Sequence, residues 1–138
     1  MTPSQQYRPR VVLVDDHASV RRALCGLLGP SCEVVASVDN GHHAIEAAVT
    51  LKPDIMVVDL MMPEMDGLEV CRRMKEVAPE TDVIIMTAFD DAHIAKVVVE
   101  AGASGFLPKH AAAGTLKSTI EGLIAKRAKG RQPGGEPS

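Results

Sequence analysis

Ile55-Met56-Val57-Val58-Asp59 is an apolar run that ends abruptly in a carboxylate. A strand without polar alternation is typical of a parallel sheet, because helices cover both of its faces. Three further runs stop at polar side chains in the same way: residues 11–14 before Asp15 and Asp16, residues 83–86 before Thr87, and residues 105–108 before Lys109. The carboxyl ends of parallel strands share one edge, where ligands bind. The pattern therefore predicts a site for a divalent cation and a phosphoryl group, built from three carboxylates, a hydroxyl and an ammonium.

Segments with helical periodicity separate these runs. Apolar residues recur at spacings of three and four, as in the first such segment at Val20, Ala23, Leu24, Leu27 and Leu28. A weaker strand-like run at residues 33–36 follows it. Five alternating strand–helix units predict an α/β domain with a doubly wound, five-stranded parallel sheet and five helices. In the flavodoxin-like strand order 2-1-3-4-5 the first and third strands are neighbours, which places Asp15 and Asp16 beside Asp59.

The composition fits one domain with a substantial core. The chain has 138 residues, of which 46% are hydrophobic, and this suits a single folded unit. No run approaches the roughly 18 apolar residues of a membrane span, and residues 1–10 lack the apolar stretch of a signal peptide. The three cysteines have no metal-ligand spacing, so we expect buried free thiols in a reducing compartment. These features predict a cytoplasmic protein that does not enter the membrane.

The two ends of the chain differ in composition from its middle. Residues 1–9 are expected to form a flexible N-terminal extension, and residues 10–126 the folded domain. Basic residues followed by a Gly/Pro-rich end predict a flexible tail or linker at residues 127–138. A net charge of −3 and an aromatic content of 2% provide neither a basic surface nor a stacking platform, so we expect no direct binding of nucleic acid.

The acidic edge predicted here requires a compensating cation. Two unit charges 4 Å apart repel by roughly 4 kcal/mol at an effective dielectric constant of about 20. Hard oxygen ligands favour Mg²⁺. Four histidines lack the spacing of metal ligands, and we expect them on the surface: His17, His42, His43 and His93. Lys109 adds a fixed positive charge. Each polar residue alone has an ordinary explanation as a helix cap or surface group, but their joint placement at strand ends favours phosphoryl chemistry.

These residues together resemble the receiver domain of two-component response regulators. The resemblance covers residues 10–126 and rests on four motifs: Val14-Asp15-Asp16, Asp59-Leu60-Met61-Met62-Pro63 with Asp66-Gly67, Thr87-Ala88, and the stretch from Gly102 to Lys109. It implies that Asp59 is the phosphoacceptor and takes its phosphoryl group from a phosphohistidine on a sensor histidine kinase. It also implies a signalling switch that catalyses its own phosphorylation and slow autodephosphorylation, and that is not otherwise an enzyme.

The resemblance also assigns the cation and its ligands. It implies that Mg²⁺ is bound by the carboxylates of Asp16 and Asp59 and by the backbone carbonyl of Met61. Asp15 would contribute through a water molecule.

A second group of residues would report the phosphorylation state. The resemblance implies that Thr87 and Lys109 each contact a phosphoryl oxygen. Phe106 matches the switch aromatic of the family, which turns inward when Thr87 moves toward the phosphate. A loop with two stable arrangements would then respond to the charge added at Asp59.

The chain departs from the usual family pattern after the lysine. Many receivers have a proline there, joined through a cis peptide bond, whereas this chain has His110. The sequence leaves open whether the Lys109-His110 bond is cis or trans. Receivers of transcription factors with a C-terminal helix-turn-helix commonly lack that proline too.

Met61 and Phe89 flank the expected pocket and would limit the access of water, so we expect a phosphoryl half-life of minutes or longer.

Two forms of output are compatible with the sequence. In one, a stand-alone receiver controls a partner protein. In the other, the chain is the receiver of a transcriptional regulator whose C-terminal DNA-binding domain lies outside it. The surface of the fourth helix, fifth strand and fifth helix is a candidate partner or homodimer face, because Val99 lies off the inner stripe of its helix.

Two other functional classes share parts of this pattern. A phosphohydrolase with an aspartyl-phosphate intermediate, resembling the haloacid dehalogenases, needs a general acid two residues beyond Asp59. That position is Met61, which cannot transfer a proton. A flavin-binding module of the same fold needs a hydroxyl-rich phosphate loop after the first strand, and the acidic residues there would repel a phosphate. Both are weaker hypotheses than the receiver.

Overall fold

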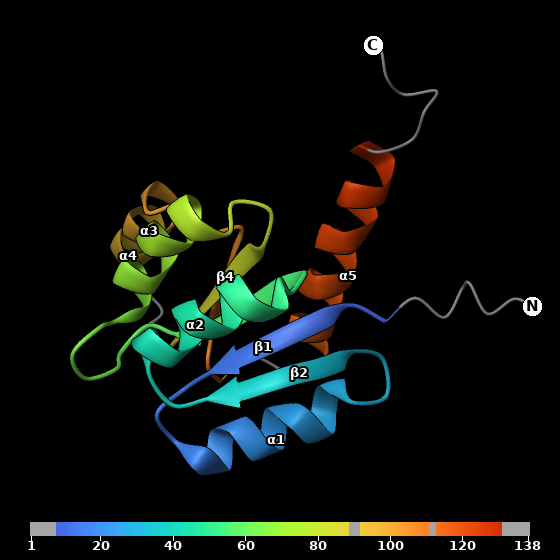
Figure 1. Cartoon of the computed structure of the whole chain (residues 1–138), viewed down its shortest axis with the longest axis horizontal. Helices are drawn as coiled ribbons and strands as arrows, with labels where there is room; N and C mark the ends of the chain where they lie inside the picture. The colour runs from blue at the N-terminus through green and yellow to red at the C-terminus, as the bar shows by residue number, and fades with distance from the viewer. Residues whose placement is uncertain (1–7, 89–91, 111–112, 131–138) are drawn as a thin grey trace, which may run out of the picture.

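Five parallel strands form the centre of the molecule (Figure 1). The computed structural model describes residues 8–88, 92–110 and 113–130. The strands are β1 (Arg10–Val14), β2 (Glu33–Val38), β3 (Ile55–Asp59), β4 (Asp82–Thr87) and β5 (Gly105–Pro108). The helices are α1 (Ala18–Leu28), α2 (Gly41–Leu51), α3 (Gly67–Val77), α4 (Ala92–Glu100) and α5 (Ala113–Gly130). The order β2-β1-β3-β4-β5 confirms the predicted flavodoxin-like, doubly wound α/β fold.

Helices cover both faces of the sheet, and Figure 1 shows α1 and α2 on opposite sides of the β1–β2 pair. Alternate strand residues pack into one core cluster with α2, α3 and α4: Val12, Val14, Met56, Val58, Val83 and Ile85. The intervening residues pack into a second cluster with α1 and α5: Val11, Leu13, Ile55, Val57, Ile84 and Met86. Strands buried on both sides have no place for polar alternation, which explains the continuous apolar runs in the sequence.

Side-chain caps and one glycine define the helix ends. The Asn40 side chain accepts a hydrogen bond of 2.9 Å from the N–H of His43 at the start of α2. Asp66 caps α3 in the same way, by accepting from the N–H of Glu69 at 2.9 Å. Each cap satisfies a backbone donor that has no partner within its helix. Gly102 follows α4 with φ of 105°, a conformation that glycine adopts without strain.

The folded region begins slightly before the expected boundary at residue 10. Pro9 is buried, and the Arg8 guanidinium donates hydrogen bonds to the carbonyls of Gly29 and Cys32. Carbonyls that follow the end of a helix need such donors. Arg8 therefore attaches the start of β1 to the connection between α1 and β2.

At the other end, α5 continues to Gly130, past the expected boundary at residue 126. Arg127 lies in this extension and anchors it to neighbouring loops. Its Nη1 lies 3.2 Å from Oδ1 of Asp54, and its Nη2 donates to the Glu80 carbonyl at 2.9 Å. The guanidinium thus joins α5 to the loops that precede β3 and β4, at the end of the sheet opposite the predicted site.

The loop between β3 and α3 lies directly against the end of β3. The Gly67 N–H donates to the Leu60 carbonyl at 2.8 Å. A Cβ atom at Gly67 would lie 2.8 Å from the carbonyl oxygen of Asp59 and 2.9 Å from Cα of Leu60. Only glycine allows this approach without moving the backbone that carries the Asp59 carboxylate.

The Gly67→Ala substitution is therefore expected to destabilise the domain by about 1–3 kcal/mol, because overpacking here meets backbone atoms rather than a flexible side chain. Urea unfolding measures this change in the free energy of unfolding. Gly122→Ala is the matched control, since a Cβ there meets no atom within 4 Å, and it should leave stability unchanged or raise it by up to about 1 kcal/mol. Equal effects of the two substitutions would contradict the role assigned to Gly67.

Candidate functional site

The predicted strand-end residues meet at one edge of the sheet. Asp15 follows β1, Asp59 ends β3, Thr87 ends β4 and Lys109 follows β5. Asp15 and Asp59 are 3% and 5% exposed, and Thr87 is fully buried. The structure therefore places two carboxylates below the surface, where water screens their repulsion poorly.

The Lys109 ammonium bridges these two carboxylates. Its Nζ lies 3.1 Å from Oδ2 of Asp15 and 3.2 Å from Oδ2 of Asp59. The backbone N–H of Lys109 donates to the Thr87 carbonyl at 2.6 Å. The end of β4 thus positions the residue whose side chain joins the ends of β1 and β3.

The charge balance at Asp59 remains incomplete in spite of this bridge. Burial and the neighbouring charge of Asp15 raise the pKa of Asp59, and Lys109 and the Met61 N–H offset only part of the rise. Partial burial acts to lower the pKa of Lys109, but its bonds to Asp15 and Asp59 outweigh this, and the pKa is raised. The pocket therefore has an excess of negative charge that further positive charge would stabilise.

Arg21 holds the loop that carries the acidic pair. Its Nη1 donates to the Asp15 carbonyl at 2.7 Å, and its Nε donates to Oγ of Ser37 at 3.0 Å. The Asp15 N–H also donates to the Val38 carbonyl at 3.1 Å. The sequence pattern gives no signal for Arg21, because its position on the amphipathic helix α1 is that of an ordinary surface residue.

His17 also belongs to the acidic edge. It is exposed, as expected, but its Nδ1 lies 3.1 Å from Oδ1 of Asp15 and 3.2 Å from Oδ1 of Asp16. Its spacing in the sequence predicts a surface position and no role at the site. Its position directly after the aspartate pair was the signal that could have identified it.

Four side chains form a group that could hold a metal ion. One ligand atom from each of Asp15, Asp16, His17 and Asp59 lies within 4.8 Å of the others. Asp16 and His17 are the exposed members, so the group opens to solvent on one side. Met61 lies at the same edge, where its N–H is 3.4 Å from Oδ1 of Asp59. Carboxylate oxygens are the ligands that Mg²⁺ prefers, so these residues fit the expected cation.

The expected switch residues lie on neighbouring strands. Thr87 is at the end of β4. Phe106 is half-buried in β5, where it pairs with Ile85 of β4 and packs against the core cluster of α2, α3 and α4. The expected flanking residue Phe89 lies outside the described residues.

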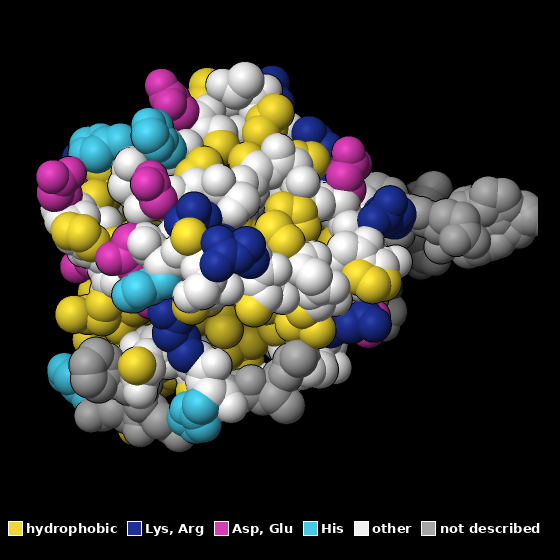
Figure 2. All heavy atoms as spheres, turned by 90° about the horizontal axis from the view of Figure 1, so that it is seen from below, with side chains coloured by type: hydrophobic (Ala, Val, Ile, Leu, Met, Phe, Trp, Pro, Cys, Tyr) yellow, Lys and Arg dark blue, Asp and Glu magenta, His cyan; other side chains and the backbone are white. Residues whose placement is uncertain are grey.

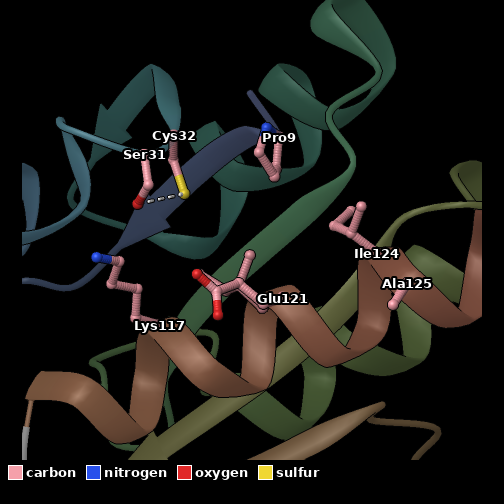
Figure 3. A pocket seen from close by; sticks show the side chains of 8 residues that line it. Pro9, Ser31, Cys32, Lys117, Glu121, Ile124 and Ala125 are labelled. Atoms are coloured by element: carbon pink, nitrogen blue, oxygen red, sulfur yellow. Dashed lines mark hydrogen bonds between the residues drawn. The ribbon is translucent and has the colours of Figure 1, made fainter. Parts of the chain in front are cut away.

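Other features of the described residues do not contribute to this edge. Cys32 and Cys71 are buried free thiols, as expected, whereas Cys25 is half-buried. Cys32 lines a separate cavity of about 320 Å³ between Pro9 and α5, into which Lys117 and Glu121 point (Figure 3).

On the face in Figure 2, basic and acidic side chains are interspersed with hydrophobic ones, without a continuous basic surface. Within the described ranges, no helix has the length and apolarity needed to cross a membrane.

The fold and the site define a class of protein: the chain belongs to the family of response regulator receiver domains. The family model described as "Response regulator receiver domain" matches residues 11–121. The resemblance inferred from the sequence motifs is thereby confirmed.

Particular relatives agree with this membership. The chain is 37% identical over 117 residues to the transcriptional regulatory protein YdfI of Bacillus subtilis (strain 168), covering 83% of this chain and 54% of the relative. It is 34% identical over 113 residues to LiaR of the same strain, covering 80% of this chain and 54% of LiaR. The chain thus spans about half the length of these curated relatives.

Solved structures show the same architecture. A two-component response regulator of the LuxR family from Aurantimonas sp. SI85-9A1 superposes with a TM-score of 0.83 at 31% identity, covering 87% of each chain. The signal receiver domain of the putative response regulator NarL from Mycobacterium tuberculosis gives a TM-score of 0.76 at 32% identity, covering 90% of this chain and 98% of that one.

The raised pKa of Asp59 predicts that Asp59→Asn stabilises the ion-free domain at neutral pH. A carboxyl group with a raised native pKa binds its proton more tightly in the folded than in the unfolded state. Its ionisation therefore destabilises the fold as pH rises through that pKa. The gain from asparagine should be largest above the native pKa and should shrink as pH falls toward the ordinary aspartate value of about 3.9.

Urea unfolding in EDTA at pH 7.5 and pH 4.5 measures this effect. Asp39→Asn, at an exposed carboxylate outside the cluster, should change the free energy of unfolding by less than about 0.5 kcal/mol at both pH values. A loss of stability in Asp59→Asn at pH 7.5 would mean that the Lys109 bridge outweighs burial and repulsion, contrary to this interpretation.

Proposed function

We propose that this receiver domain accepts a phosphoryl group on Asp59 from the phosphohistidine of a sensor histidine kinase. The observation that supports this most is the pair of buried carboxylates, Asp15 and Asp59, bridged by Lys109 at the sheet edge. An Asp59 oxygen would form a bond to phosphorus while the bond from phosphorus to the histidine nitrogen breaks. That nitrogen leaves with the electron pair.

The residues of this edge have different roles in the phosphoryl transfer. We assign the cation site to the carboxylates of Asp16 and Asp59 and the Met61 carbonyl, with Asp15 acting through water. Bound Mg²⁺ would neutralise charge on the phosphoryl oxygens, which is the main requirement of such transfers. Lys109 already contacts Asp59 and so stands beside the oxygens that the transfer brings to it.

The readout of phosphorylation is assigned to Thr87, Lys109 and Phe106. Thr87 and Lys109 end neighbouring strands and are joined by a backbone hydrogen bond of 2.6 Å. A phosphoryl group at Asp59 adds acceptor oxygens that both side chains would contact. Phe106 lies on β5 and packs against the core cluster of α2, α3 and α4, and it would turn inward as Thr87 moves.

The output is proposed to pass through a further protein or domain. YdfI and LiaR are described as transcriptional regulatory proteins, which favours the receiver of a transcriptional regulator over a stand-alone receiver. The surface of α4, β5 and α5 is the candidate homodimer or partner face. Val99 of α4 is 63% exposed, more than any other large hydrophobic residue in the described ranges.

Incubation with acetyl phosphate and Mg²⁺, followed by intact-mass measurement, tests the phosphoacceptor. We expect one phosphoryl adduct on the unmodified chain and none on Asp59→Asn. Asp54→Asn is the matched control, because this carboxylate lies at the opposite end of β3 and pairs with Arg127; it should retain the adduct. An adduct that survives Asp59→Asn would place the acceptor elsewhere.

The lifetime of the adduct is a separate prediction. Met61 is an apolar neighbour of Asp59 that offers no side-chain group to orient an attacking water molecule. We therefore expect a half-life of minutes or longer, followed by intact mass after acetyl phosphate is removed. A half-life of seconds would contradict this expectation.

A further inference from the structure

His17 is held at the acidic edge by its backbone. Its N–H donates to Oδ1 of Asp15 at 2.8 Å, just before α1 begins. The same residue places its ring Nδ1 3.1 Å from that oxygen and 3.2 Å from Oδ1 of Asp16. The imidazole nitrogen therefore lies between the oxygens of both members of the aspartate pair.

These separations match the spacing of ligands around one ion. Two donors bound at roughly 2.1 Å and at right angles to each other lie about 3 Å apart, as in octahedral sites. Nδ1 of His17 has this spacing to two carboxylate oxygens, and Asp59 completes a group within 4.8 Å. A single cation can therefore contact the imidazole and the carboxylates together.

Lys109 does not occupy the same oxygens. Its ammonium contacts the Oδ2 atoms of Asp15 and Asp59, whereas His17 lies beside the Oδ1 atoms of Asp15 and Asp16. The lysine and the histidine thus approach the cluster at different oxygens. A cation on the His17 side leaves the lysine bridge in place.

We infer that His17 is a direct ligand of the divalent cation, and that it shifts the preference of the site from Mg²⁺ toward transition-metal ions. This inference rests on the cation site of the proposed function. Mg²⁺ prefers oxygen ligands, whereas an imidazole nitrogen suits ions such as Ni²⁺ and Zn²⁺. The carboxylates accept both kinds of ion, so the histidine is the group that discriminates between them.

Electron spin-echo measurements on the Mn²⁺-loaded full chain test the bond directly. A ligating imidazole nitrogen produces ¹⁴N modulation of the Mn²⁺ signal. We expect this modulation in the unmodified chain and in His42→Ala, an exposed histidine on α2, and its loss in His17→Ala. Absence of modulation in the unmodified chain, or its persistence in His17→Ala, would overturn the inference.

Calorimetric titrations with Ni²⁺ and Mg²⁺ test the selectivity. His17→Ala should weaken Ni²⁺ binding by at least about 10–100-fold, the loss that mutation of an outer-shell partner of a ligand already causes, and should change Mg²⁺ binding much less. An equal loss for both ions would mean that His17 only positions the aspartates, and would overturn the inference.

The acetyl phosphate experiment separates this inference from the proposed function. The unmodified chain should form the Asp59 adduct with Mg²⁺, independently of whether His17→Ala weakens the binding of Ni²⁺. If the adduct forms but Ni²⁺ affinity is unchanged, the histidine is not a ligand and the phosphoacceptor assignment stands. If no adduct forms on the unmodified chain, the proposed function fails, whatever the spin-echo result.

Discussion

The ion bridge from Lys109 to Asp15 and Asp59 is the interaction on which the acidic edge depends. It joins the ends of three strands that are far apart in sequence, with Nζ 3.1 Å and 3.2 Å from the two carboxylates. Burial strengthens both the attraction and the repulsion at this point. One ammonium cannot balance two buried carboxylates and the adjacent Asp16, so the sheet edge is built to gain from an additional cation.

The sequence was sufficient to predict the sheet and the residues at its edge. A strand covered on both faces must be apolar throughout, so the runs before Asp15, Asp59 and Thr87 were distinct from the amphipathic helices. Strand order then determined which side chains meet. Each of these residues lies at the carboxyl end of a strand, and the apolar run that forms the strand can be recognised from the local sequence.

The residues that sequence reasoning missed act through long side chains or local geometry. Arg21 reaches the Asp15 carbonyl from α1, and Arg127 reaches Asp54 from a helix more than seventy residues away. Periodicity in the sequence does not specify which groups the guanidinium of a long, flexible side chain contacts. A search for metal-ligand spacing does not identify His17, because its contact with Asp15 is made within a turn of two residues.

The negative charge that Lys109 leaves unbalanced at the aspartates links the stability of the domain to signalling. A site with an excess of negative charge is stabilised by any cation that neutralises this charge, so cation binding and the free energy of folding are coupled. The coupling can spread because Lys109 is attached twice: its ammonium contacts Asp59, and its N–H donates to Thr87. A new negative charge on Asp59 would attract the Lys109 ammonium, and the ends of β4 and β5 would move together. In the proposed mechanism, the conformational switch therefore begins in the interaction that joins Lys109 to Asp15 and Asp59.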